Sequence, residues 1–321
     1  MSRLIVEVTR GSEVESRHEV IALQLDANGK RQAIFGSAEE WSRPIFPRSA
    51  IKPLQALALV ESGGIEKLKL RPAHLALACA SHNGERIHRE LATDWLKILG
   101  LSESYLKCGA HWPSSNEAMR EEARVHLQPS ALTNNCSGKH LGFLTACQVQ
   151  GWDLETYKQW DHPLQKKIRA IVSSLAEVNL ERVPWGVDGC GIPTLAMGLD
   201  LWTKAMAIFL TTAVGPSQIW EAVARNPELI GGAADFNTKI LRDLNGAVLL
   251  KNGAEGVALI ADRKHGFLLG IKALDGAARA RDAVTGFLLG RWSELQDSGP
   301  TEIKNWNGEV TGEIRVTELS T

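Results

Sequence analysis

A serine and a lysine three positions apart begin an apolar segment near the start of the chain. Ser49 and Lys52 lie in the string PRSAIKPLQALALVESGG, which ends at Gly63 and Gly64. The string predicts a buried helix whose first turn holds both residues, because Pro53 is tolerated only near a helix start. Residues three apart share a helix face, so the amine is expected to reach the hydroxyl. A lysine desolvated by apolar neighbours can act as a base toward a serine nucleophile.

A second lysine supports this chemistry, which a single S-x-x-K would not establish because that spacing arises by chance in most chains of this length. Lys251 begins the string KNGAEG directly after the apolar residues 247–250. A lysine at a strand edge followed by glycine resembles the K-T-G element of penicillin-recognising serine enzymes, which accompanies S-x-x-K there. Asn252 replaces the usual threonine. Alone, Lys251 would be a solvated lysine before a hairpin turn, but beside the Ser49–Lys52 pair it favours an enzyme.

Two further segments concentrate polar and flexible residues. Residues 79–85 read CASHNGE and end an apolar run, which is typical of a buried element that delivers groups into a cleft. The alternative is a loop in which Ser81 or Asn83 only caps the next helix. Residues 134–140 read NNCSGKH, in the sequence region where penicillin-type enzymes carry an S-D-N loop. Helix capping by Ser137 would explain one residue of these seven.

The strand patterns that must position these groups lie at both ends of the chain. Hydrophobic and polar residues alternate over residues 4–35, and a hairpin signal at Asn28 and Gly29 predicts antiparallel strands there. Strand patterns return within residues 247–274 and again over residues 308–319.

Helical periodicity dominates the middle of the chain, including a predicted helix from Ser137 to Gly151. We therefore predict an α+β fold, with a mixed, mainly antiparallel sheet built from both termini and a helical lobe inserted between them. The sheet lobe is expected to cover about residues 1–60 and 240–321, and the helical lobe about residues 61–239, within one two-lobed catalytic domain.

Composition limits the classes of partner. The chain has 321 residues, with 36 lysines and arginines against 37 acidic residues, so no net field favours nucleic acid or an anionic membrane. The opening MSRLIVEVTRG lacks the apolar run of a signal peptide, and no segment predicts a membrane span. Five irregularly spaced cysteines fit a reducing compartment with free thiols. A cytoplasmic protein acting on a small molecule is expected.

Seven strings, in order along almost the whole chain, resemble the Rhizobium-type L-asparaginases, also called asparaginase II, whose fold is akin to serine β-lactamases and bacterial glutaminases. The strings are PRSAIKPLQ at 47–55, SHNGE at 81–85, CGAHWP at 108–113, NNCSGKHLGFL at 134–144, GVDGCGIP at 186–193, KNGAEGV at 251–257 and DGAARA at 275–280. The resemblance implies hydrolysis of L-asparagine to L-aspartate and ammonia by a homodimer.

The resemblance also implies two serine–lysine pairs. The first is Ser49 with Lys52, and the second is Ser81 with Lys251, although Lys264 in a nearby turn is an alternative partner for Ser81. The expected mechanism is attack by the Ser49 hydroxyl on the side-chain amide, proton transfer through the pairs, and hydrolysis of an aspartyl ester.

Other polar residues of the strings are expected to bind the substrate. The backbone N–H groups of Ser49 and Ala254 are the expected oxyanion donors, by likeness to the glutaminases. The remaining expected substrate-binding residues are Arg48, His82, Asn83, Glu85, Asn134, Asn135, Asp188 and Glu255.

Cys136, Lys139 and Cys190 form a candidate zinc site. Two distant cysteines with no histidine at ligand spacing are a weak metal signal, and buried thiols lining the pocket are the alternative. No cofactor is required, since Ser49 already supplies a nucleophile, and zinc would modulate the site.

Two rival functions remain open at this stage. One is a serine transferase or peptidase of the penicillin-recognising type, against which the absence of a signal-peptide pattern argues. The other is a non-catalytic module that binds an amino acid or a metal. Release of ammonia from asparagine by the purified protein separates these hypotheses.

Overall fold

The chain passes repeatedly between two structural units. The computed structural model describes residues 2–125, 128–296 and 299–320. The sheet unit comprises Met1–Ala50, Ala196–Leu210 and Leu250–Thr321, and the helical unit comprises Ile51–Leu195 and Thr211–Leu249. The predicted α+β class, with strands from both termini, is confirmed.

The unit boundaries differ from the predicted lobes. The helix α2 (Lys52–Glu61) belongs to the helical unit because it packs there against α7 (Ser137–Gln150) and α8 (Pro163–Ala176). Residues 196–210 join the sheet unit because α9 (Leu199–Ala205) packs on strand β8 (Phe267–Ala273). At Gly270 of β8, a Cβ would lie 1.9 Å from the Thr203 hydroxyl oxygen, so this close packing requires glycine.

The sheet has the strand order β6-β7-β8-β2-β1-β10-β9, and β3 also pairs with β2. Its strands are β1 (Ser2–Arg10), β2 (Glu13–Asp26), β3 (Arg31–Phe35), β6 (Val248–Gly253), β7 (Val257–Asp262), β8 (Phe267–Ala273), β9 (Thr301–Lys304) and β10 (Val310–Ser320). The predicted antiparallel pairing of the first three strands is confirmed, with Gly29 at a φ of 77° in the expected hairpin. The long strand β2 joins both termini, since it pairs with β1 and with β8.

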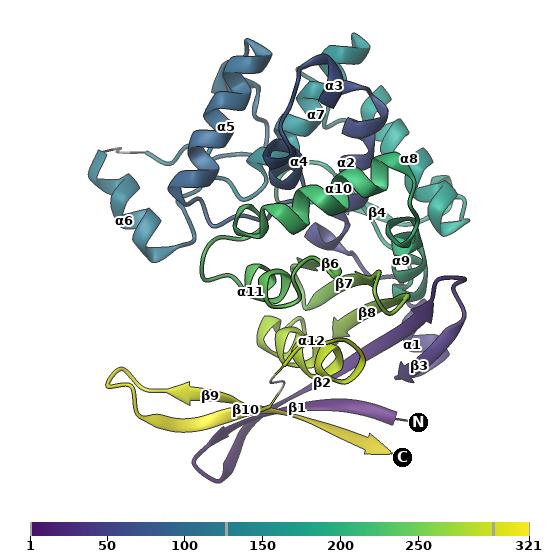
Figure 1. Cartoon of the computed structure of the whole chain (residues 1–321), viewed down its shortest axis with the longest axis vertical. Helices are drawn as coiled ribbons and strands as arrows, with labels where there is room; N and C mark the ends of the chain where they lie inside the picture. The colour runs from purple at the N-terminus through teal and green to yellow at the C-terminus, as the bar shows by residue number, and fades with distance from the viewer. Residues whose placement is uncertain (1, 126–127, 297–298, 321) are drawn as a thin grey trace. The chain divides into compact units, whose positions relative to one another are not determined.

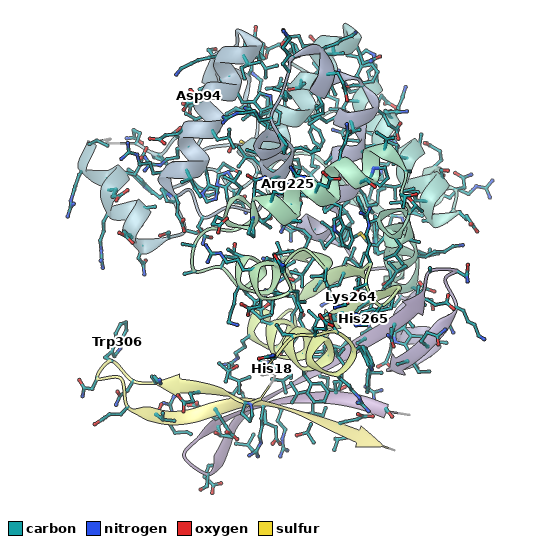
Figure 2. All side chains as sticks on the ribbon, in the orientation of Figure 1. His18, Asp94, Arg225, Lys264, His265 and Trp306 are labelled. Atoms are coloured by element: carbon teal, nitrogen blue, oxygen red, sulfur yellow. The ribbon has the colours of Figure 1, made fainter. Side chains whose placement is uncertain are left out.

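The sheet unit also contains α1 (Ala38–Ser42), the 3₁₀ helices η1 (Arg48–Ile51) and η4 (Met206–Leu210), and α12 (Ala278–Trp292). Helix α12 lies along the sheet and contacts β1, β2, β7, β8 and β10 (Figure 1). Alternate β1 residues Leu4, Val6 and Val8 are buried, as a half-buried strand requires. Trp306 projects fully exposed from the turn between β9 and β10 (Figure 2).

The helical unit is built around a short buried helix, α4 (Pro72–Ala78), which contacts α2, α5 (Arg86–Leu99), α7 and α10 (Val214–Arg225). Its helices are α2, α3 (Gly64–Lys67), α4 (Pro72–Ala78), α5 (Arg86–Leu99), η2 (Glu103–Tyr105), α6 (Asn116–Val125), α7 (Ser137–Gln150), α8 (Pro163–Ala176), η3 (Leu180–Arg182), α10 (Val214–Arg225), η5 (Pro227–Leu229) and α11 (Phe236–Asp243). A small hairpin joins β4 (Trp185–Val187) and β5 (Pro193–Leu195). Helices α2 and α7 were both expected from the sequence. Within the described ranges, no helix is long and apolar enough to cross a membrane.

Candidate functional site

Ser49 lies in a strained turn of the sheet unit. It belongs to η1, which continues directly into α2, with Pro53 in the first turn of α2 as predicted. The preceding residue, Arg48, has a φ of 52°, in the left-handed region that non-glycine residues rarely adopt. Such strain costs on the order of 1–3 kcal/mol and gathers at functional sites. The backbone therefore marks the half-buried Ser49 as a candidate nucleophile.

The end of β6 packs against this turn. A Cβ on Gly253 would lie 2.2 Å from the Pro47 carbonyl oxygen and 3.0 Å from the Ala50 nitrogen, so a larger residue would displace the turn that carries Ser49. Lys251, two residues earlier, is buried, and its amine donates to the Asn252 carbonyl at 2.7 Å. Two strings far apart in the sequence thus meet within the sheet unit.

Helix α12 holds the end of β6 in place. The Arg281 guanidinium donates to the Gly253 carbonyl at 2.8 Å, and the Asn252 amide donates to Asp282 at 3.0 Å. Beyond Gly253, Ala254 and Glu255 form the exposed turn to β7, where Glu255 has a φ of 58°. Both contacts come from residues that directly follow the DGAARA string at 275–280.

Lys264 occupies a different environment from Lys251. It lies in the exposed turn between β7 and β8 (Figure 2) and forms an ion pair of 2.5 Å with Glu294. Lys251 is 1% exposed. Burial and the contact of its strand with the Ser49 turn favour Lys251 as the second lysine of the site, and its pairing with Ser81 stays a prediction.

In the helical unit, three of the strings meet at the amine of Lys52. The Lys52 side chain is fully buried. Its Nζ donates to the Ala80 carbonyl and to the Asn135 carbonyl, the latter at 3.1 Å, and lies 3.1 Å from the Ser81 hydroxyl oxygen. The amine therefore connects the start of α2, the end of α4 and the start of α7.

The environment of Lys52 favours a base. Burial lowers the pKa of its amine, and the charge of neighbouring Cys136 only partly opposes this. A neutral amine has two N–H donors and one lone pair. When the Lys52 amine is deprotonated and its donors bond to the Ala80 and Asn135 carbonyls, its lone pair can accept a proton from the Ser81 hydroxyl.

Ser81 is held by a short extended pairing. Its N–H donates to the Ile230 carbonyl at 2.9 Å, and the Asn83 N–H donates to the Gly231 carbonyl at 2.7 Å. The Glu85 carboxylate accepts the Ala233 N–H at 3.1 Å. The polar segment after α4 is thus fixed on a packed scaffold.

His82 is buried, and protein groups engage both of its ring nitrogens. Nδ1 accepts the Gly84 N–H at 3.2 Å, so the proton lies on Nε2, which donates to the Ser137 hydroxyl at 2.9 Å. Burial lowers the pKa of His82 well below its usual value, with His88 stacked at 4.7 Å adding to the effect. The ring is therefore neutral and joins the segment of Ser81 to α7.

The amide of Asn134 is likewise occupied by the backbone. It donates to the Cys108 and Gly109 carbonyls, both at 3.0 Å, and its oxygen accepts the Cys136 N–H at 2.8 Å. The string CGAHWP is thereby joined to NNCSGKH. The next N–H, that of Asn135, donates to His111, which is absent from the expected site residues although it lies within one of the seven strings.

Cys136, Lys139 and Cys190 lie together, although the cysteines are 54 positions apart (190 minus 136). Helix α7 carries Lys139, and the turn between β4 and β5 carries Cys190 and Asp188. The Lys139 amine donates to the Cys190 sulfur at 2.9 Å.

The charges in this cluster support one another. A hydrogen bond from Cys190, together with the Lys139 and Lys52 charges, lowers the pKa of Cys136 well below its usual value despite burial. The same hydrogen bond and burial raise the pKa of Cys190. Burial alone would lower the pKa of Lys139, but Cys136, Cys190 and Asp188 outweigh it and raise that pKa. The cluster is thus a thiolate, a thiol and an ammonium.

The donors of this cluster suit zinc only in part. Thiolates are good zinc ligands, whereas lysine must lose its proton before it can bind a metal. In the described part of the chain, no group of three or more histidine, cysteine or carboxylate side chains is placed to hold a metal. A zinc ion here would rely on Cys136, Cys190 and the amine.

Comparison with known proteins adds one strong match. A family model described as L-asparaginase II matches residues 6–316. Among curated proteins, none matches the chain significantly.

Some solved structures show weak similarity. A putative β-lactamase from Bacteroides dorei is 10% identical over 91% of this chain and 93% of that chain, with a TM-score of 0.43. A mutant of simvastatin synthase (LovD) from Aspergillus terreus is 13% identical over 86% of this chain and 91% of that chain, with a TM-score of 0.41. TM-scores this low identify neither the fold nor the activity of this chain.

Proposed function

Because this chain belongs to the L-asparaginase II family, we propose that it hydrolyses the side-chain amide of L-asparagine to L-aspartate and ammonia. The observation that carries the proposal is the buried amine of Lys52, bonded to two backbone carbonyls and 3.1 Å from the Ser81 hydroxyl. A desolvated amine beside a hydroxyl is the arrangement that activates a serine for attack.

In the proposed mechanism, the Ser49 hydroxyl oxygen forms a bond to the side-chain carbonyl carbon, and its proton passes to Lys52. Collapse of the tetrahedral intermediate breaks the C–N bond, and the proton returns through Lys52 and Ser81 to the leaving nitrogen as ammonia. Water then hydrolyses the aspartyl ester and restores Ser49. The Ser49 and Ala254 N–H groups would stabilise the oxyanion, each by roughly 3 kcal/mol.

The other proposed roles rest on the family strings. Lys251 is the proposed second lysine, acting with Ser81 on the proton path. Asn135, Asp188, Asn83 and Arg48 carry polar groups suited to bind the amino acid, and Glu255 lies in the turn of Ala254. The bonds already made by His82, Asn134 and Glu85 support a role in holding these segments.

We also propose that the Cys136–Lys139–Cys190 cluster binds one zinc ion. Two sulfur ligands and an amine would hold the ion, which would act as a Lewis acid and fix the cluster when bound. The ion would replace the protons of Cys190 and Lys139. The attack itself is assigned to Ser49. A homodimer in the cytoplasm is proposed on the family resemblance, and five free thiols suit that compartment.

The test is the release of ammonia from L-asparagine by the purified protein, with L-aspartate measured in the same reaction. Equal amounts of both products support the proposal. Transfer of the acyl group to an added amine or peptide would indicate a transferase instead. Saturable binding of asparagine without turnover would indicate a binding module. L-glutamine, measured in parallel, gives the substrate preference.

A further inference from the structure

Asn135 is held on both sides of its backbone. Its carbonyl accepts a hydrogen bond from the Lys52 amine at 3.1 Å, and its N–H donates to Nε2 of His111 at 3.0 Å. All three residues belong to the helical unit. The position of one of the two carbonyls that orient the amine therefore depends on His111.

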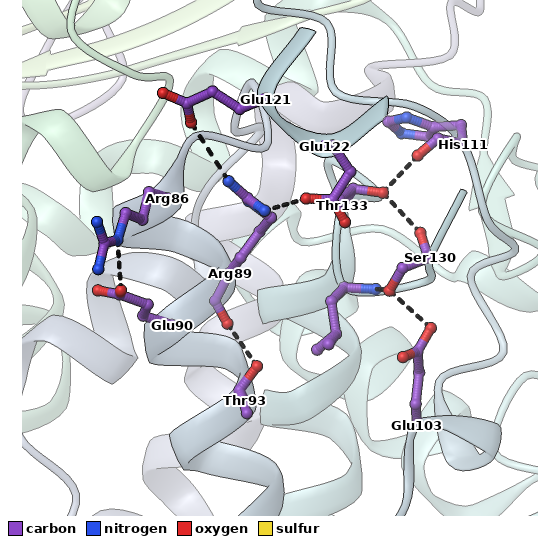
Figure 3. Close-up of polar contacts among 11 residues, drawn as sticks. Arg86, Arg89, Glu90, Thr93, Glu103, His111, Glu121, Glu122, Ser130 and Thr133 are labelled. Atoms are coloured by element: carbon purple, nitrogen blue, oxygen red, sulfur yellow. Dashed lines mark hydrogen bonds and ion pairs between the residues drawn. The ribbon is translucent and has the colours of Figure 1, made fainter. Parts of the chain in front are cut away.

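The tautomer of His111 follows from its contacts. Since Nε2 accepts the Asn135 N–H, the ring proton lies on Nδ1, which donates to the Trp112 carbonyl at 2.6 Å. The loop that carries the ring is anchored separately. The Thr133 hydroxyl lies 2.5 Å from the His111 carbonyl oxygen and 2.7 Å from that of Ser130 (Figure 3). The His111 ring therefore bonds to Asn135, whereas its backbone carbonyl bonds to Thr133. A variant of His111 and a variant of Thr133 can remove these two contacts separately.

We infer that His111 is a positioning residue for Lys52, acting through the backbone of Asn135. The inference rests on the proposed role of Lys52 as the base. By accepting the Asn135 N–H, His111 holds the peptide group before Asn135, and the Cys136 N–H, bonded to the Asn134 side chain, holds the peptide group after it. Together they orient the Asn135 carbonyl, which accepts one N–H of the Lys52 amine. The lone pair of the deprotonated Lys52 amine is thereby kept toward the Ser81 hydroxyl.

Loss of this acceptor has a definite consequence. The Asn135 N–H would turn toward another acceptor or water, and the Asn135 carbonyl would keep only the support of the Cys136 N–H bond to the Asn134 side chain. The Lys52 amine would then lose one of the two backbone carbonyls that orient it and would keep the Ala80 carbonyl. A displaced catalytic group lowers the rate of the chemical step more than it weakens substrate binding.

The test compares His111→Leu, which has no acceptor, with His111→Gln, whose side-chain oxygen can accept the Asn135 N–H. Thr133→Val is the matched control, because it removes an anchor of the same loop and leaves the ring in place. Thermal unfolding of each variant verifies that it is folded. We expect His111→Leu to lower kcat for asparagine by roughly 10- to 100-fold with little change in KM. His111→Gln should recover most of kcat, and Thr133→Val should lose stability with kcat near that of the wild type.

Two results would overturn the inference. If His111→Gln loses as much kcat as His111→Leu, the acceptor is not what matters. If Thr133→Val lowers kcat equally, His111 only anchors its loop.

A second measurement separates this inference from the proposed substrate. The rate at which a fluorophosphonate labels the active serine, located by peptide mass spectrometry, reports activation of the nucleophile for any substrate. If wild-type protein is labelled but releases no ammonia from asparagine, the substrate assignment fails, and His111→Leu must still slow labelling for the inference to stand. Unchanged labelling in His111→Leu would refute the inference even if asparagine is the substrate.

Discussion

The Nζ of Lys52 lies 3.1 Å from the Oγ of Ser81, across 29 positions of sequence. The spacing in the sequence pairs Lys52 with Ser49, and the family resemblance pairs Ser81 with a second lysine. The structure shows that Lys52 itself contacts Ser81. The Lys52 amine is suited to exchange a proton with Ser81, and the proposed mechanism also takes it as the base toward Ser49. Both serines are therefore expected to matter, in different ways.

Replacing Ser49 by alanine should lower kcat by several orders of magnitude, because only binding and oxyanion stabilisation would remain. Ser81→Ala should be less damaging, by about 10²- to 10⁴-fold, because it removes a proton carrier and leaves the nucleophile. Steady-state ammonia release measures both. More than a tenth of wild-type kcat in Ser49→Ala, or a larger loss in Ser81→Ala, would show that Ser49 is not the attacking residue.

Lys52→Met should abolish turnover and change how stability depends on pH. Burial lowers the pKa of Lys52 in the folded protein, so between this pKa and about 10.4 the unfolded chain binds more protons than the folded one. The free energy of unfolding of the wild type, minus that of the variant, should therefore rise as pH increases through this window. Urea unfolding at several pH values tests this. A difference independent of pH would mean that the pKa of Lys52 is not lowered.

Lys251→Ala should lower kcat strongly, whereas Lys264→Ala should leave it near the wild-type value. Lys251 is buried at the end of β6, and Lys264 forms an exposed ion pair with Glu294, a type of contact worth about 0–1 kcal/mol. Both variants remove one lysine charge, so a difference in kcat between them reflects the position of the lysine and not the loss of charge. The reverse order of activities would assign the second serine–lysine pair to Lys264.

Gly138→Ala should destabilise the protein by roughly 1–3 kcal/mol, because the added Cβ would lie 2.2 Å from the Leu77 carbonyl oxygen where α7 crosses α4. The same change at Gly286, in α12, is the control. A Cβ there meets no atom within 4 Å, so helix propensity should stabilise it by up to about 1 kcal/mol. Chemical denaturation measures both. Gly138→Ala should also lower kcat, since α7 carries the residues after Asn135, and equal stability of the two variants would contradict this packing argument.

Protein purified without a chelator should contain close to one zinc per chain, and Cys136→Ser should lose most of it. Cys147→Ser is the control, because Cys147 is a buried thiol of α7, the helix that directly follows Cys136, and burial raises its pKa to about 12. Elemental analysis measures the metal. If the wild-type protein contains no metal, the zinc proposal is wrong, and Cys136 and Cys190 are thiols that only pack in the protein interior. A kcat that falls to zero on chelation and recovers with Zn²⁺ would contradict the assignment of the attack to Ser49.

Much of the local structure follows from the sequence alone. The hairpin at Asn28 and Gly29, the helix that begins at Lys52 after its 3₁₀ turn, and the helix from Ser137 depend on turn residues, proline position and hydrophobic period. These signals act over a few residues, so the order of elements and the α+β class were predictable. The seven strings also indicated the family and most residues of the candidate site.

Contacts between elements were decided only by the tertiary structure. The proximity of Lys52 to Ser81, the hold of Asn135 by His111, and the assignment of residues 196–210 to the sheet unit depend on how helices pack across long stretches of chain. Close approaches such as Gly138 on Leu77 set these contacts. Local periodicity shows which face of a helix is buried but does not identify the partner that buries it, because packing depends on the shapes of surfaces distant in sequence.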